Sequence, residues 1–220
     1  MFINKMGYYH IEYGINNQDF GFEIPGFKCV VDGCSGVKHS EVGAKLFCRK
    51  LEKALVSGEG FSYPLIDSIF KDLIDFIGGD SKDLLDYLSF TILLLEERET
   101  EFRFFVSGDG ILIKESPDHK IMIEDINHSE YPAYFIYRFI DPEMVSPHLL
   151  ENSRFQESVF PKTEFKTIGV STDGLRYLFQ LEEEEQAVFK NLLIQRKEFP
   201  IKRFINKHHK VFQDDTSFVF

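Results

Sequence analysis

The sequence predicts an α+β fold in a single domain, residues 1–220. Strand-like segments, helix-like segments, a longer series of strand-like segments, two more helices and a final strand follow one another in blocks. Such blocks are typical of antiparallel sheets with separate helical layers, whereas regular alternation of strand and helix predicts a parallel sheet. The 220 residues are enough for one well-buried core, since single domains commonly reach about 200 residues.

The amino-terminal part is expected to form short strands followed by a long helix. Strands separated by tight turns are predicted at residues 7–11, 20–22 and 27–31. The helix is predicted over residues 40–56, because Val42, Leu46 and Leu55 fall near one helical face and Ser40 can cap its first turn.

The middle of the chain is expected to form two helices and then several strands. Residues 64–77 carry apolar side chains at helical spacing and stop at a Gly-Gly pair, and residues 81–88 form a shorter helix. Strands are predicted at residues 90–95, 101–106, 111–113, 121–123 and 134–139. Asp109, which lies between two glycines, is expected in an exposed turn of a meander.

The remaining third begins with residues 141–161, which are expected to be a loop because Pro142 and Pro147 interrupt them. The segments predicted beyond this loop are a strand at residues 165–171, helices at 183–196 and 200–207, and a final strand that follows Asp214-Asp215.

Charge and cysteine content exclude several classes of function. With 36 acidic and 25 basic residues, the net charge of −11 repels nucleic acid and anionic membranes, so neither is expected as a partner. Only three cysteines are present, without a CxxC pair, which predicts neither a disulfide framework nor a zinc site. No apolar run approaches the ~18 residues of a membrane span, and the first residues lack the apolar core of a signal peptide. A cytoplasmic location is therefore expected, and nothing in the sequence indicates an oligomeric state.

Three predicted strands end at an aspartate next to glycine, namely Asp32, Asp109 and Asp173. Carboxylates at similar ends of different strands can converge on one metal site, and glycine allows the tight turn that such a site requires. Taken singly, each residue also fits an ordinary turn, because Asp-Gly is a common turn dipeptide.

The order of these motifs resembles the metal-dependent type 2C protein phosphatases, and most closely their compact bacterial branch. The resemblance is carried by residues from His10 to Val219, nearly the whole chain. Its pieces are, in order, Asn17-Gln18-Asp19, Val31-Asp32-Gly33, Ser40-Glu41-Val42-Gly43-Ala44, Gly108-Asp109, Ser171-Thr172-Asp173-Gly174 and Asp214-Asp215-Thr216-Ser217-Phe218-Val219.

The resemblance implies a four-layer α-β-β-α sandwich of two antiparallel sheets flanked by helices, with two Mn²⁺ or Mg²⁺ ions at one end. Asp32 would bridge the two ions, and the Gly33 carbonyl would bind one of them. Asp173 and Asp214 would hold the other ion. Asp109 matches an acid that helps to hold a third, weaker ion, and Asp19 matches an acid beside the cluster that acts through water.

The implied reaction is hydrolysis of phosphoserine or phosphothreonine on a phosphoprotein substrate. Two ions about 4 Å apart acidify a bridging water, orient the phosphate and neutralise developing charge. Asp32 and Asp173 are therefore the residues on which catalysis is expected to depend. His10 is the candidate for contact with the substrate phosphate, with a half-buried structural histidine as the alternative.

Three departures from the family pattern favour other functions. The arginine that grips phosphate in many members is absent around Gly14, Cys34 stands where some members carry a proton-donating histidine, and Gln18 replaces a frequent glutamate. A pseudo-phosphatase that acts as a regulatory or binding module is the main alternative. A third possibility is a domain that the metal only stabilises.

Overall fold

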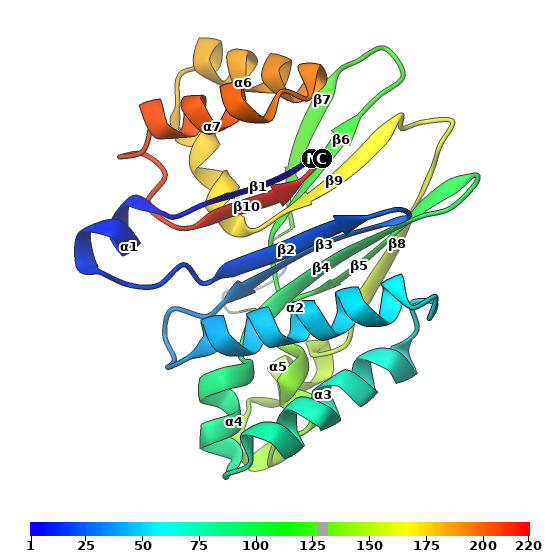
Figure 1. The fold of residues 1–220 in the computed structure, drawn as a ribbon, viewed down its shortest axis with the longest axis vertical. Helices are drawn as coiled ribbons and strands as arrows, with labels where there is room; N and C mark the ends of the chain where they lie inside the picture. The colour runs from blue at the N-terminus through cyan, green and yellow to red at the C-terminus, as the bar shows by residue number, and fades with distance from the viewer. Residues whose placement is uncertain (127–131) are drawn as a thin grey trace.

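The computed structural model describes residues 1–126 and 132–220, and in these residues two five-stranded antiparallel sheets lie face to face (Figure 1). The first sheet contains, in spatial order, β1 (Phe2–Lys5), β10 (Thr216–Val219), β9 (Thr167–Ser171), β6 (Ile111–Glu115) and β7 (Ile121–Asp125). The second sheet contains, also in spatial order, β2 (Asp19–Ile24), β3 (Phe27–Gly33), β4 (Phe90–Glu97), β5 (Glu101–Ser107) and β8 (Gln156–Pro161).

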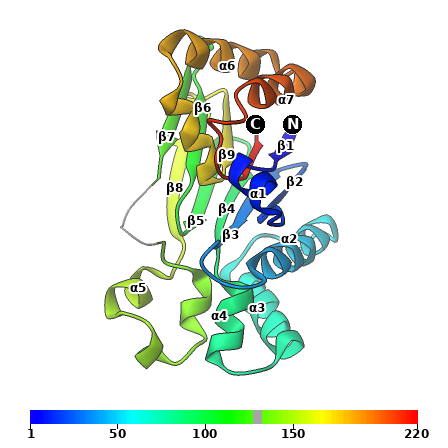
Figure 2. The same ribbon diagram turned by 90° about the vertical axis from the view of Figure 1, so that its left-hand side faces the viewer.

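Helices cover the outer face of each sheet, which gives the four layers that Figure 2 shows from the side. The helices on the second sheet are α2 (Ser40–Val56), α3 (Tyr63–Ile77) and α4 (Ser81–Leu88), and those on the first sheet are α6 (Glu183–Gln195) and α7 (Glu198–Lys207). The predicted α+β sandwich of two antiparallel sheets flanked by helices is confirmed.

The space between the sheets is filled by a separate apolar core. Along β3, Val30 points into this core while Cys29 and Val31 point toward the helical layer, because successive side chains of a strand face opposite sides. Both faces of the strand are therefore buried. This explains why its fully buried residues 29–31 are a continuous apolar run without alternation with polar residues.

Phenylalanine dominates the core under α3. Phe70 is fully buried there, and its ring contacts those of Phe47, Phe90, Phe135 and Phe139.

We expect Phe70→Ala to lower the free energy of unfolding by about 3–5 kcal/mol, because it removes a large buried ring and leaves a cavity. Phe76, on the same helix, is 76% exposed, so Phe76→Ala is expected to change it by less than about 0.5 kcal/mol. Urea unfolding of both variants measures the difference. Equal effects would contradict this description of the core.

The strand predicted at residues 7–11 is wrong, because α1 (Tyr8–Tyr13) is a short helix there. The helix ends at Gly14, whose φ of 65° is left-handed, a conformation that glycine adopts without steric cost. Backbone N–H groups of Tyr8 and Tyr9 donate to the carbonyls of Phe212 and Gln213. These bonds to a segment distant in sequence decide the conformation, and β1 supplies the amino-terminal strand instead.

Residues 134–139 were also wrongly predicted as a strand. They contain a 3₁₀ turn, η1 (Phe135–Arg138), in which Phe135 and Ile136 are fully buried against the helical layer. The aromatic content indicated burial correctly but not the backbone conformation.

The loop predicted over 141–161 contains regular structure. A 3₁₀ turn η2 (Pro142–Met144) is followed by α5 (Pro147–Asn152) and by β8, an edge strand that pairs with β5. The first four residues of β8 are exposed, so the strand lacks the apolar alternation by which a strand is recognised.

Candidate metal centre

A buried aspartate, Asp19, and a half-buried one, Asp32, face each other at one end of the space between the sheets. Asp19 begins β2 and is the cross-strand partner of Asp32, near the end of β3. Asp32 lies on the same side of β3 as Val30, two residues earlier, and that side faces the other sheet. Strand register therefore holds the two carboxylates side by side.

Two further carboxylates reach the same place from the first sheet. Asp173 follows β9 and begins the 3₁₀ helix η3 (Asp173–Gln180), and Asp214 precedes β10. Together with Asp109 they line a pocket of about 180 Å³ whose wall also includes Asp32 and Gly33. The structure thus brings five of the six predicted metal-site residues to one pocket. The sixth, Asp19, lies next to Asp32 on the paired strand β2.

The turn at Asp109 differs from the predicted meander. The Gly108-Asp109-Gly110 segment does not join two strands of one sheet, because β5 belongs to the second sheet and β6 to the first. Gly108 adopts a left-handed φ of 98° as the chain crosses, which favours glycine. The crossing carries Asp109 to the pocket, and its side chain is only 17% exposed.

Electrostatic effects in the pocket oppose ionisation of these acids. Burial raises the pKa of Asp32 well above its usual value, and the negative charges of Asp19, Asp173 and Asp214 raise it further. Burial and the charge of Asp109 raise the pKa of Asp173 to about 6. Clustered carboxylates of this kind need a compensating cation to remain charged at neutral pH.

The donor set fits a hard divalent cation, which prefers carboxylate, carbonyl and water oxygens. Asp19 is 3% exposed, and its Oδ2 accepts a hydrogen bond of 2.6 Å from the Thr172 hydroxyl. Its Oδ1 is buried and has no hydrogen-bond partner among the residues that the structure describes. A buried, unpaired carboxylate oxygen beside Asp32 is the feature expected where an ion or its water shell completes the site.

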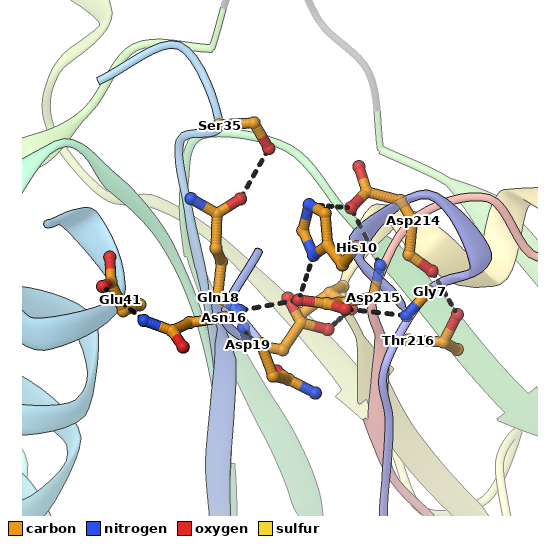
Figure 3. A network of polar contacts seen from close by, with 12 residues as sticks. Gly7, His10, Asn16, Gln18, Asp19, Ser35, Glu41, Asp214, Asp215 and Thr216 are labelled. Atoms are coloured by element: carbon orange, nitrogen blue, oxygen red, sulfur yellow. Dashed lines mark hydrogen bonds and ion pairs between the residues drawn. The ribbon is translucent and has the colours of Figure 1, made fainter. Parts of the chain in front are cut away.

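Asp214 and Asp215 are adjacent in sequence but have different partners (Figure 3). The carboxylate of Asp215 is 1% exposed and accepts hydrogen bonds from the backbone N–H groups of Gly7 (2.8 Å) and Gln18 (2.6 Å). Its Oδ2 also lies 2.8 Å from Nδ1 of His10. Asp214 is 38% exposed and lines the pocket, so Asp214 is the member of the pair that is free to bind an ion.

Comparisons with known proteins bear on the family and the fold of the chain. A family model described as protein phosphatase 2C matches residues 6–208. The chain belongs to the protein phosphatase 2C family. Because the match ends before Asp214, the role of that residue depends on the geometry of the pocket. No curated protein matches the sequence significantly.

Solved phosphatase structures share the fold at low sequence identity. The serine/threonine phosphatase Stp1 from Staphylococcus aureus superimposes with a TM-score of 0.62 at 16% identity, over 99% of this chain and 92% of that chain. MsPP, a PPM Ser-Thr phosphatase from Mycobacterium smegmatis in complex with cacodylate, gives 0.62 at 14% identity, over 99% and 95%. The catalytic domain of PstP, in complex with two manganese ions, gives 0.59 at 12% identity, over 99% and 94%.

His10 of this phosphatase-family chain lies between two carboxylates and is 2% exposed. Its Nδ1 faces Asp215, and its Nε2 lies 3.7 Å from Asp214. The Asp215 carboxylate beside Nδ1 raises the pKa of His10, with the charge of Asp214 contributing in the same direction. Of the two interpretations of this residue, the structural one fits its burial better than contact with the substrate phosphate.

Gln18, which replaces a frequent family glutamate, holds the loop after β3 against α2. Its side-chain oxygen accepts a 2.6 Å hydrogen bond from the Ser35 hydroxyl, and its amide nitrogen donates to the Ser40 hydroxyl at 3.2 Å. A glutamate could accept from both serines but could not donate to either. The glutamine is thus matched to its two neighbours, and its side chain points at serines.

Arg176 is a residue of the site that the sequence analysis missed. Its guanidinium reaches Asp173 (Nη1 to Oδ2, 3.3 Å) and Asp109 (Nη2 to Oδ2, 3.6 Å). The available signal was the spacing of three residues between Asp173 and Arg176, which places them on one side of a helical turn. Asp215 and Thr172 were likewise inside the quoted motifs but were not singled out.

None of the helices that the structure describes is both long and apolar enough to cross a membrane.

We expect Asp173→Asn to be more stable than the wild type in EDTA at pH 7.5. The pKa of Asp173 is raised from about 3.8 to about 6 in the folded protein, so the folded state is penalised when the group is charged. This penalty is present above pH 6 and disappears as the pH falls toward 4. The variant should exceed the wild type by about 1–3 kcal/mol at pH 7.5 and by only about a third as much near pH 4.5. Urea unfolding at both pH values tests this, and a constant difference would contradict it.

Proposed function

We propose that this chain is a metal-dependent phosphatase that hydrolyses phosphoserine and phosphothreonine on protein substrates. The observation that carries the proposal is the convergence of Asp32, Asp173 and Asp214 on one pocket at the end of the sandwich. Membership of the protein phosphatase 2C family supports the same reaction, and the two manganese ions named for PstP support a dinuclear centre. The proposed cofactors are two Mn²⁺ or Mg²⁺ ions.

The pocket residues would share the task of holding the ions. Asp32 lies at the centre of the carboxylates and is assigned the bridging position, with the Gly33 carbonyl beside it. Asp173 and Asp214 are assigned to one ion, and Asp19 to its water shell. Ions held there would supply a water nucleophile of lowered pKa and would neutralise charge on the transferring phosphoryl group.

The buried His10–Asp215 pair is proposed to position Asp214. The Asp215 carboxylate accepts hydrogen bonds from the backbone N–H groups of Gly7 and Gln18. The first bond fixes the start of α1, and the second fixes the backbone just before β2. His10 then presents Nε2 to the carboxylate of Asp214. His10 also lines a pocket next to the metal pocket, but it is 2% exposed and both of its ring nitrogens face carboxylates, so we assign it to orienting a ligand and not to gripping the substrate phosphate.

A phosphoprotein could enter beside this pair. A second pocket, of about 260 Å³, is lined by Tyr9, Ser35, Tyr177 and Asp214 among others. It shares Ser35 and Asp214 with the metal pocket. Its tyrosines offer flat apolar faces and hydroxyl groups, which suit a peptide that flanks a phosphorylated residue.

A pseudo-phosphatase, which binds but does not turn over, remains the second candidate. Gly14 stands where many relatives use an arginine to grip phosphate, and Cys34 lines the metal pocket where some relatives have a histidine. Neither loss removes a carboxylate, so metal binding alone cannot separate the two candidates.

The deciding experiment is hydrolysis of phosphoserine and phosphothreonine peptides, and of p-nitrophenyl phosphate, by the purified chain with Mn²⁺ or Mg²⁺. We expect phosphate release that EDTA abolishes and added Mn²⁺ restores. Metal binding without turnover on all three substrates would identify the binding module instead. Absence of both metal binding and turnover would contradict the proposed metal centre.

A further inference from the structure

Arg176 places a fixed positive charge among the carboxylates of the metal pocket. Three acids surround its guanidinium, and two of them, Asp109 and Asp173, line the pocket itself. The third, Asp125, is the last residue of β7 and lies outside the pocket lining. One arginine therefore links β7, the crossing between the sheets, and the start of η3.

Asp125 anchors the arginine. Nε donates to Asp125 Oδ2 at 2.5 Å and Nη2 donates to Asp125 Oδ1 at 3.0 Å, which is the bidentate arrangement of an arginine–carboxylate pair. The side chain starts only three residues after Asp173, on the 3₁₀ helix that Asp173 begins. Held at both ends, the guanidinium has little freedom to leave Asp109 and Asp173.

A divalent ion and this guanidinium would compete for the same oxygens. Nη2 faces Asp109 Oδ2 and Nη1 faces Asp173 Oδ2, so a further cation bound by both carboxylates would have to approach a positive charge at contact distance. Like charges this close repel each other. Asp32, Asp214 and Asp19 make no ion pair with Arg176 among the described residues.

We propose that Arg176 is a built-in counter-cation that commits Asp109 to an ion pair and limits the centre to two divalent ions. This inference builds on the proposed function and changes one of its expected ligands. Asp109 is then not a metal ligand in the resting protein, and no third ion binds beside it. Asp173 stays a ligand because only its Oδ2 contacts Arg176 and its carboxylate also neighbours those of Asp32 and Asp214, whereas the charges that act most strongly on Asp109 are those of Arg176 and Asp125.

The test counts bound Mn²⁺ per chain by the electron paramagnetic resonance signal of free Mn²⁺ during titration. We expect two ions for the wild type and three for Arg176→Ala, because removal of the guanidinium leaves Asp109, Asp125 and Asp173 around a site without a counter-charge. Arg176→Lys keeps the positive charge and should bind two. The double variant Arg176→Ala/Asp109→Asn should lose the additional ion.

Stability gives a second readout that does not depend on activity. In EDTA, Arg176→Ala should melt at a lower temperature than the wild type, because three carboxylates lose their partner. Saturating Mn²⁺ should raise the melting temperature of Arg176→Ala by more than it raises that of the wild type. Arg138→Ala is the matched control. Arg138 forms an ion pair with Asp67 at 2.9 Å on the helical layer and does not line the metal pocket, so its removal should leave the ion count unchanged.

Equal ion counts for Arg176→Ala and the wild type would overturn the inference, as would a wild type that loses an ion on Asp109→Asn. If Arg176→Ala fails to fold, the single variant Asp109→Asn decides, since an unchanged count supports the inference and a reduced count overturns it. A wild type that binds no ion would reject the proposed function. The gain of one ion in Arg176→Ala would still support the role of the arginine.

Discussion

Asp32→Asn is expected to abolish turnover while it leaves the fold intact. Asp32 lies among the other carboxylates and is the one residue assigned to both ions, so its loss should disrupt the whole centre. Even residues that act on a metal through its ligands commonly contribute about 10–100-fold to activity, so we expect kcat/KM to fall by more than about 100-fold. Phosphopeptide hydrolysis at saturating Mn²⁺ measures the change.

The melting temperature of the same variant separates a catalytic from a structural role. In EDTA, Asp32→Asn should melt at or above the wild type, because it removes a half-buried charge whose neighbours raise its pKa. Mn²⁺ should raise the melting temperature of the wild type by mass action but not that of the variant. Asp72→Asn is the control. Asp72, on α3, is exposed and pairs with Lys50 of α2, so this substitution should change neither the activity nor the melting temperature. An Asp32→Asn protein that keeps near-full activity would refute the assignment of the centre.

Gly174→Ala is expected to disrupt the centre through the backbone. A Cβ at position 174 would lie 1.8 Å from the backbone carbonyl oxygen of Asp215 and 2.8 Å from Thr216 Oγ1. A methyl group cannot fit unless η3 and β10 move apart. Asp173 is the first residue of η3, and Asp214 lies just before β10. Overpacking of this kind typically costs about 1–3 kcal/mol, and we expect Mn²⁺ affinity to fall as well because the two ligands move apart.

Gly60→Ala is the matched control for this substitution, because a Cβ at position 60 meets no atom within 4 Å. Its stability should equal that of the wild type or exceed it slightly, since alanine reduces the freedom of the unfolded chain. Urea unfolding and a Mn²⁺ titration of both variants provide the comparison. If Gly174→Ala binds Mn²⁺ as tightly as Gly60→Ala, the close approach of η3 and β10 does not control the site.

The elements that could be predicted from the sequence are those whose signal is local. The helix at Ser40–Val56 was predicted at its observed bounds because its apolar spacing lies within one segment. The predicted cap is wrong, because the N-cap residue is His39, without a side-chain hydrogen bond, and the Ser40 hydroxyl donates to the Cys34 carbonyl. Asp32 and Asp173 were found for a similar reason, since an apolar strand that ends in Asp-Gly is visible in ten residues. Strand register then accounts for the meeting of Asp19 with Asp32.

The features that could not be predicted depend on contacts between distant segments. The helix α1 is set by bonds to the carbonyls before β10, and β8 is an exposed edge strand that only its pairing with β5 defines. The role of Arg176 depends on Asp125, which lies 51 positions away in the chain. Asp214 and Asp215 are identical residues in adjacent positions, and only their burial and the backbone donors that Asp215 meets in the fold distinguish them.

The most direct test of the central claim is anomalous scattering from crystals of this protein soaked with Mn²⁺. We expect two strong peaks in the pocket, both within coordination distance of Asp32, with Asp173 and Asp214 at one of them and none coordinated by Asp109. Peaks only on the outer surface, or an empty pocket at saturating Mn²⁺, would contradict the claim that these carboxylates form one dinuclear centre.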